Sequence, residues 1–211
     1  MTQGITGTRL RRVPQQDRSR DKLRRVLDAA DGLLAREGGE ALVTTRVAAA
    51  AGVAVGSLYA YFPDKEAIVE ALALRYWGEI ERRIAAVVEA DERAPLPDPT
   101  GALLDAVAEG FRASPGFRAL WFSGLRTERL RDSTRPLRIM VGTLIERVVA
   151  VHWPDADAAE RVTVARMYVL AGDGLLREAF RLDPNGDVTV LLEGHRMLDA
   201  YIIARLGEAG A

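Results

Sequence analysis

Three residue types are scarce in this sequence of 211 residues. Cysteine is absent, histidine occurs only at His152 and His195, and 27 of the 29 basic residues are arginine, so that Lys22 and Lys65 are the lysines. The absence of cysteine excludes disulfides, thiolate metal sites and cysteine nucleophiles. Because the two histidines lie far apart in the chain, we expect no metal site built from them.

Sequence motifs of catalysis are missing as well. The chain has no glycine-rich phosphate-binding loop, no nucleophile elbow and no helix with paired histidines. We therefore expect a protein that is not an enzyme and that uses no cofactor.

Long apolar runs are also absent. No stretch of 18 apolar residues occurs, so we expect no segment that spans a membrane. The first residues, MTQGITGTRLRR, lack the apolar stretch of a secretory signal. With 48% hydrophobic residues, the chain can bury a sizeable core as one long domain or two short ones. These features indicate a soluble protein of the cytoplasm.

The charge is nearly balanced in total, at −1, but it is unevenly distributed along the chain. Residues 1–65 contain 11 basic and 7 acidic side chains, which leaves 18 basic and 23 acidic side chains for the remainder. A positive N-terminal third is typical of a nucleic-acid surface. A solvated charged tail has the same composition, and residues 1–16, with Arg9, Arg11 and Arg12, are expected to form a flexible basic arm.

Apolar residues recur at helical spacing along most of the chain, and no segment has the alternating pattern of a strand. Prolines and glycines separate the helical segments. We predict an all-α fold of about nine helices, over residues 17–38, 44–52, 55–61, 65–93, 100–114, 116–125, 134–153, 157–182 and 188–206.

Residues 44–65 have the spacing of a helix-turn-helix. Two short helices flank a turn at Gly52, where a conformationally permissive residue is needed, and Thr44 is expected to cap the first of them. The second helix is short enough to enter a major groove and carries no acidic residue that would repel phosphate. An ordinary helical hairpin with two half-buried tyrosines has the same spacing. The positions expected to point inward are Val47, Ala48, Ala51, Leu58 and Phe62.

The residues of this segment resemble a known family. The run GVAVGSLYAYFPDKEAI, from Gly52 to Ile68, closely resembles the signature of the tetracycline-repressor (TetR) family of transcriptional regulators. The resemblance covers about residues 17–75. At Ala54 the chain departs from the family, which usually has Ser or Thr there to cap the recognition helix. Further matching positions upstream are Ala29, Ala30, Leu34, Gly38, Thr44, Thr45, Val47 and Ala48.

This resemblance implies a ligand-responsive regulator, most simply a repressor that binds a palindromic operator in double-stranded DNA as a homodimer and is released by a small effector. It implies a DNA-binding domain over residues 17–79 and an effector-binding and dimerisation domain over residues 80–211. The implied contacts with backbone phosphates are made by Thr45, Tyr61 and Lys65. Ser57 and Tyr59 are implied to lie against base edges or adjacent phosphates, and Gly56 allows close approach of the backbone.

The resemblance also assigns dimerisation to the last two predicted helices. Gly172, Gly174 and Gly194 lie inside them, where close helix–helix approach at a dimer seam, a kink or a tolerated weak spot accounts for glycine. Asp173 is a polar pocket group, a partner for an arginine across the dimer, or part of an exposed turn. The candidate effector contacts form a stripe of a kind that is more often plain core than ligand wall: Phe111, Phe117, Trp121, Phe122, Met140, Met167 and Tyr168, with Asp173.

The alternative function is an all-α dimeric small-molecule-binding protein without DNA binding. Its one support in the sequence is Ala54, because a missing cap weakens the second helix of the helix-turn-helix.

Overall fold

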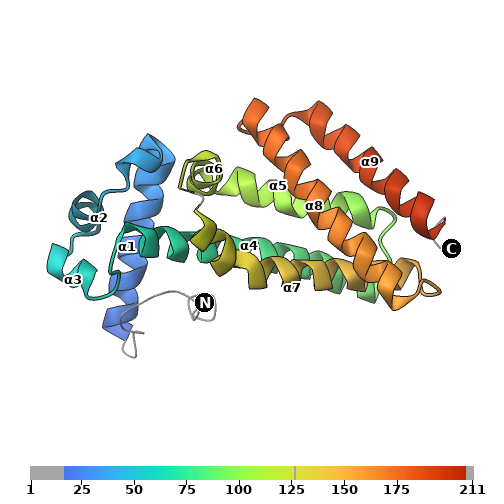
Figure 1. The fold of residues 1–211 in the computed structure, drawn as a ribbon, viewed down its shortest axis with the longest axis horizontal. Coiled ribbons are helices and arrows are strands. Elements are labelled where there is room, and N and C mark those ends of the chain that lie inside the picture. Colours follow the sequence, from blue (N-terminus) through green and yellow to red (C-terminus); the bar gives the residue numbers. More distant parts are fainter. Residues whose placement is uncertain (1–16, 126, 208–211) are drawn as a thin grey trace. The chain divides into compact units, whose positions relative to one another are not determined.

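The computed structural model describes residues 17–125 and 127–207, so the arm predicted over residues 1–16 lies outside the described part. Within these ranges the protein is all-α, with nine α-helices, one 3₁₀-helix and no strand (Figure 1). None of the described helices is both long and apolar enough to cross a membrane. In chain order the elements are α1 (Asp17–Glu37), η2 (Gly39–Ala41), α2 (Thr44–Ala51), α3 (Val55–Tyr59), α4 (Lys65–Arg93), α5 (Pro99–Ala113), α6 (Pro115–Phe122), α7 (Glu128–His152), α8 (Ala158–Leu182) and α9 (Val188–Leu206).

The described residues form two compact units. The first unit contains the residues up to Gly78 together with Ser114–Arg135, and the second contains Glu79–Ala113 together with the residues from Pro136 onward. Helices α4 and α7 therefore contribute to both units, and each unit is built from segments that lie far apart in the sequence.

In the first unit, α1 packs against α2 and α6. Its apolar residues recur three and four positions apart, so they lie on one face of the helix and are buried together. The side chains of Val26, Ala30 and Leu34 are at most 1% exposed. This face supports α2, against which α3 packs, and both helices are too short to be stable without packing.

A buried carboxylate, Glu70, joins α4 to the start of α7 within the first unit. It is 4% exposed and accepts hydrogen bonds from Arg129 Nε at 2.9 Å, Arg129 Nη2 at 3.0 Å and the Ser133 hydroxyl at 2.7 Å. The hydrogen bonds with Glu70 raise the pKa of Arg129. A buried charge is tolerated only when it is paired in this way, so the cluster holds the two helices in one register.

In the second unit, α8 packs along α9, and α5 lies against both. Phe111 of α5 stacks on Phe180 of α8 with ring centroids 4.9 Å apart. A Cβ added at Gly194 of α9 would lie 3.0 Å from Leu175 Cδ1 of α8, so glycine permits close approach of these helices within one chain. Close approach of α8 and α9 within one chain thus accounts for Gly194 without a dimer seam.

Two helix boundaries differ clearly from those predicted. Helix α6 ends at Phe122 rather than at 125, because the Ser123 hydroxyl donates a hydrogen bond to the last turn of the helix at 2.8 Å. Helix α7 begins at Glu128 rather than at 134, since the Thr127 hydroxyl accepts from a free amide of its first turn at 3.2 Å. Pro136 lies inside α7, although proline is more often found at the first position of a helix.

Candidate nucleic-acid interface

Helices α2 and α3 meet at the turn that the sequence predicts. Gly52 has φ 63° and ψ 40°, the left-handed conformation that glycine adopts at low steric cost. Its N–H donates to the carbonyl of Ala49 at 3.1 Å, and the N–H of Val53 donates to the carbonyl of Ala48 at 3.0 Å. These bonds end α2 and redirect the chain, so the predicted helix-turn-helix is confirmed.

The inward side of the motif is also as predicted. All five apolar positions are buried, and Leu58 and Phe62 are 0% exposed. Helix α3 ends at Tyr59 rather than at 61, because the chain turns so that Phe62 enters the core, and Pro63 follows at once. The five expected core residues are Val47, Ala48, Ala51, Leu58 and Phe62.

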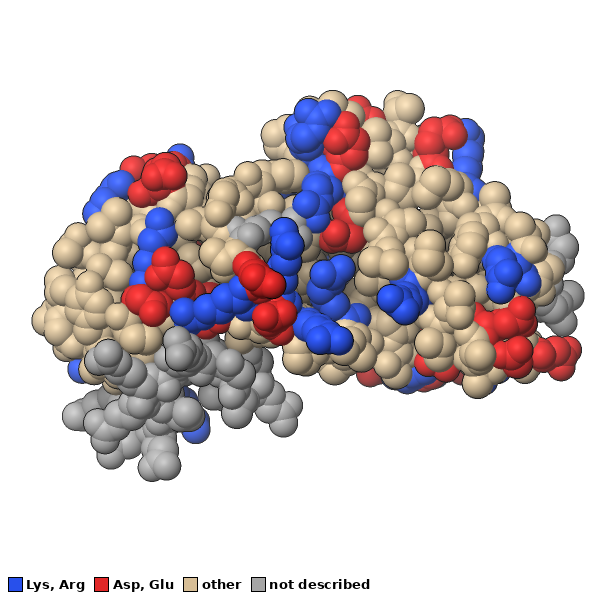
Figure 2. Space-filling model, in the orientation of Figure 1, with Lys and Arg blue, Asp and Glu red and all other residues tan. Residues whose placement is uncertain are grey.

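The opposite side of the motif is accessible. Thr45, Gly56 and Tyr59 are exposed, whereas Ser57, Tyr61 and Lys65 are half-buried. None of the five residues of α3 is charged, and the surface at α3, at the left edge of Figure 2, is correspondingly free of charged side chains. An approaching phosphate backbone would therefore meet no carboxylate on this helix.

The Thr44 hydroxyl has a different partner from the one predicted. Val43 is the N-cap of α2, since its carbonyl accepts from the N–H of Val47 at 2.9 Å, and its apolar side chain makes no cap hydrogen bond. Thr44 is thus the first residue inside the helix, and its hydroxyl is hydrogen-bonded to the Tyr59 hydroxyl at 3.1 Å. The predicted cap is wrong, and the hydroxyl instead orients the exposed tyrosine of α3.

Lys65 stands at the first position of α4. Its Nζ donates to the carbonyl of Gly39, in η2, at 3.3 Å. Asp64 accepts from the N–H of Ala67 at 2.7 Å and so caps α4. The positive end of the α4 dipole and the Lys65 ammonium therefore lie together, an arrangement that favours an anion.

Arg46 is a cation of this region that the sequence reasoning missed. Its Nη2 lies 2.9 Å and 2.7 Å from the two carboxylate oxygens of Glu37, so the pair joins α2 to α1. Both side chains are nearly half exposed. The position of Arg46 directly after Thr45, an expected phosphate contact, was the signal in the sequence that pointed to this basic residue.

The capping defect at Ala54 is present in the structure. Ala54 is the N-cap of α3, with φ −64° and ψ 141°, and it provides no side-chain hydrogen bond. The extended backbone is suited to a cap, so only the side chain is missing.

The candidate effector residues divide between the two units. Phe117, Trp121 and Phe122 belong to the first unit, and Phe111, Met140, Met167, Tyr168 and Asp173 belong to the second. In the first unit, the Trp121 ring lies 5.6 Å from Trp77 and 5.2 Å from Phe117, as part of an aromatic cluster. In the second unit, the Tyr168 hydroxyl donates to the carbonyl of Thr100 at 2.7 Å. Phe122, Met140 and Met167 are 42%, 36% and 42% exposed.

Asp173 lies inside α8, so the exposed-turn alternative is wrong. Its carboxylate pairs with Arg177, one turn further along the same helix, at 3.0 Å. Gly172 and Gly174 flank it, and a Cβ added at either would have no heavy atom within 4 Å. Contacts within the chain therefore do not account for these two glycines.

The two parts of the chain match two family models. Residues 26–72 match bacterial regulatory proteins of the tetR family, and residues 94–206 match the tetracyclin repressor-like C-terminal domain. The chain belongs to the TetR family. The resemblance found in residues 52–68 is thereby confirmed. The family model of the C-terminal domain extends the similarity to this family over residues 94–206.

Individual relatives agree with the TetR assignment. The chain is 30% identical over 150 residues to the HTH-type transcriptional repressor KstR of Rhodococcus jostii (strain RHA1), covering 70% of this chain and 68% of that protein. It is 37% identical over 100 residues to the nucleoid occlusion factor SlmA of Actinobacillus pleuropneumoniae serotype 5b (strain L20), covering 46% of this chain and 48% of SlmA. The chain thus spans about half the length of the SlmA proteins that it matches.

A solved structure extends the likeness over nearly the whole chain. A TetR-family transcriptional regulator from Streptomyces coelicolor superposes with a TM-score of 0.63 at 29% identity, covering 88% of this chain and 99% of that chain. The fold described above is therefore that of TetR-family regulators.

Proposed function

We propose that this TetR-family protein is a ligand-responsive repressor that binds a palindromic site in double-stranded DNA as a homodimer and is released by a small effector. The observation that carries DNA binding is the accessible, acid-free helix α3, held from behind by the fully buried Leu58 and Phe62. A recognition helix of five residues reads few base pairs alone, so two symmetric copies are needed for specificity. The description of KstR as a repressor supports the direction of regulation.

The accessible side chains of the motif suit different parts of DNA. Lys65, at the positive end of α4, suits a phosphate, and the hydroxyls of Thr45 and Tyr61 suit neighbouring phosphates. Ser57 and Tyr59 lie on or at the end of α3, the element that enters the groove in helix-turn-helix proteins, and suit base edges. Gly56 has no heavy atom within 4 Å of an added Cβ, so the open space in front of it admits close approach of the DNA backbone.

The exposed apolar residues of α8 and α9 support dimerisation through these helices. Each side chain is at least 40% exposed in the single chain, and packing of a second copy on these helices would remove apolar surface from water. Gly174 of α8 has open space where a second helix can approach closely. The residues are Val162, Met167, Leu170, Leu182, Val188, Leu192, Met197 and Ile203.

For the effector, the buried aromatic residues Phe111 and Tyr168 of the second unit are the proposed centre. A small, mostly apolar molecule with one polar group matches such a lining. Met167 is exposed and lies beside Leu170 on α8, so in this proposal it serves the dimer rather than the effector. Such a regulator acts in the cytoplasm, where bacterial DNA lies.

The test is selection of bound fragments from random DNA, followed by footprinting. Two symmetric protected half-sites per bound dimer are expected, and a single unsymmetric footprint made by a monomer contradicts the proposal. The double variant Leu170→Glu, Leu192→Glu should sediment as a monomer and lose most operator affinity. A matched control, Glu193→Gln, changes a neighbouring charge without adding one to the apolar face and should leave both properties unchanged.

The alternative, a small-molecule-binding protein without DNA binding, is not favoured by the family assignment. It predicts that no fragment is enriched, even though small ligands still raise the melting temperature of the protein.

A further inference from the structure

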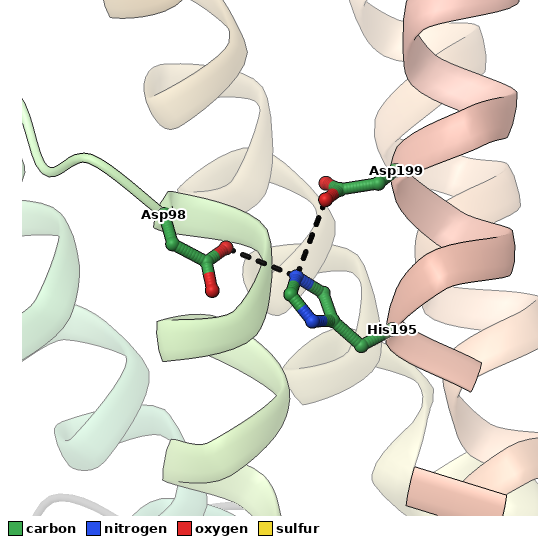
Figure 3. Close-up of side chains that lie close together, drawn as sticks. All are labelled: Asp98, His195 and Asp199. Atoms are coloured by element: carbon green, nitrogen blue, oxygen red, sulfur yellow. Dashed lines mark hydrogen bonds and ion pairs between the residues drawn. The ribbon is translucent and has the colours of Figure 1, made fainter. Parts of the chain in front are cut away.

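Three side chains outside the helix-turn-helix converge in the second unit (Figure 3). His195 Nε2 lies 3.0 Å from Asp98 Oδ1 and 3.3 Å from Asp199 Oδ2. Asp98 precedes α5, whereas His195 and Asp199 lie one turn apart on α9. One ligand atom from each residue lies within 4.8 Å of the other two. Two elements thus present one imidazole and two carboxylates to a single point.

His195 and Asp98 are in hydrogen-bond contact, and the spacing of the three ligand atoms also suits a small metal ion. Zinc binds imidazole nitrogen and carboxylate oxygen at about 2.0–2.2 Å with tetrahedral geometry, so two of its ligand atoms lie about 3.3 Å apart. The two measured nitrogen–oxygen separations, 3.0 and 3.3 Å, are close to this value. Three protein ligands would leave a fourth position for water or another ligand.

The backbone holds these residues in place. Asp98 Oδ1 also accepts from the N–H of Gly101 at 2.8 Å, so this carboxylate is fixed as the cap of α5. His195 and Asp199 share one face of α9 because residues four apart in a helix are neighbours. Helix α5 packs against α9 in this unit, which brings the two parts of the cluster together. The ligands are therefore set by elements that the fold already fixes.

Negative charge gathers at this place. Burial, and after it the charges of Asp199, Asp98 and Asp105, raise the pKa of the Tyr168 hydroxyl. One imidazole supplies at most one positive charge against these three carboxylates. A divalent cation would compensate the excess negative charge.

We propose that Asp98, His195 and Asp199 bind a divalent transition-metal ion of the zinc class, which joins the start of α5 to α9. The imidazole ligand favours zinc, cobalt or nickel over magnesium and calcium, which prefer oxygen. From the sequence we expected no metal site built from the two histidines, because they lie far apart in the chain. The proposed site instead combines one histidine, His195, with the carboxylates of Asp98 and Asp199.

The test uses the full chain freed of metal with a chelator and then titrated with Zn²⁺ in a calorimeter. One zinc per chain is expected, together with a rise in melting temperature, since a ligand that binds only the folded state stabilises it. His195→Gln should weaken zinc binding at least tenfold, and Asp98→Asn should also weaken it. Asn caps a helix as well as Asp does, so the metal-free Asp98→Asn variant should melt like the wild type.

Two controls separate ligation from simple attraction of charge. Asp105→Asn removes a nearby negative charge but no ligand atom, so zinc affinity should change by less than threefold. Co²⁺ bound to the wild type should give the strong visible absorption of a tetrahedral site, which His195→Gln should abolish. The proposal is overturned if zinc does not bind, if His195→Gln leaves binding unchanged, or if Asp105→Asn weakens it as much as His195→Gln. Because no DNA is present, these results are independent of the proposed repressor function.

Discussion

The hydroxyls of Thr44 and Tyr59 are hydrogen-bonded at 3.1 Å, so the exposed tyrosine at the end of α3 is held by the first residue of α2. The bond places the ring of Tyr59 at the surface through which we propose that α3 meets DNA. This hydrogen bond between the two helices of the motif thereby orients the side chain of Tyr59, which is a candidate for contacting a base.

We expect Tyr59→Ala to change the ranking of related DNA sites. If the tyrosine touches a base edge, its loss removes discrimination at that base pair, while the phosphate contacts and the salt dependence stay nearly the same. Competition binding with a set of single-base operator variants measures the ranking.

Tyr59→Phe serves as the matched variant, because it keeps the ring and removes only the bond to Thr44. It should lower the free energy of unfolding by about 0.5–1 kcal/mol. An unchanged ranking in Tyr59→Ala would show that this side chain reads no base.

Lys65→Ala should weaken binding to all sites to a similar extent. The variant removes one positive charge per subunit, and each phosphate contact on duplex DNA contributes about 0.9 to the slope of log affinity against log salt concentration. A dimer should therefore lose about 1.8 from this slope. Filter binding or fluorescence anisotropy at several salt concentrations measures it.

The control for Lys65 is Arg93→Ala, which removes a positive charge at the opposite end of the same helix. This variant should leave the slope unchanged. If Lys65→Ala and the wild type have equal slopes, Lys65 contacts no phosphate, and its hydrogen bond to the carbonyl of Gly39 is its remaining role.

Gly56→Ala should stabilise the free protein and weaken DNA binding. An added Cβ meets no heavy atom within 4 Å, and alanine is favoured over glycine inside a helix by up to about 1 kcal/mol. The same methyl group would occupy the space that the DNA backbone needs, so affinity should fall about tenfold or more. Urea unfolding and anisotropy titration measure the two effects separately.

Gly52→Ala provides the contrast, because the φ of 63° at Gly52 disfavours any side chain. It should lower the free energy of unfolding by about 1 kcal/mol or more. A Gly56→Ala variant with full DNA affinity would rule out close approach at Gly56.

We expect part of the folding stability to depend on pH because of the Glu92 carboxylate. The hydrogen bond from Arg147, which joins α7 to α4 at 2.7 Å, lowers the pKa of Glu92 from its ordinary value of 4.5. A group whose pKa is lower in the folded state stabilises the fold above its unfolded pKa, and this contribution is lost as the pH falls through the folded value. Glu92→Gln should therefore lower the melting temperature slightly at pH 7, and the difference should shrink as the pH falls below 4.5 and vanish once the pH is below the lowered pKa of the folded state.

Glu178→Gln is the comparison for Glu92. Its partner Arg181 lies on the same helix and also lowers the carboxyl pKa, but the pair joins no second element. The variant should show the same pH trend with a smaller change in melting temperature. A difference for Glu92→Gln that does not shrink as the pH is lowered from 7 to well below 4.5 would contradict the ion-pair explanation.

The elements of the interface could be predicted because their signals are local. The left-handed turn follows from Gly52 alone, and Leu58 and Phe62 are buried because they are the apolar positions of the short helices. Local preference was misleading at Thr44, where a hydroxyl at a helix start predicts a cap. A partner 15 residues away accepted or donated the bond instead.

What the sequence by itself determined is the all-α class, most helix boundaries, the helix-turn-helix and its family, because turn chemistry and helical periodicity depend on neighbours within a few residues. Only the tertiary structure decided which distant side chains meet. The contact of Lys65 with Gly39, the burial of Glu70 against Arg129 and the convergence of Asp98 on His195 all require helix packing. That packing depends on the summed burial of apolar faces across the whole chain, which no short stretch of sequence contains.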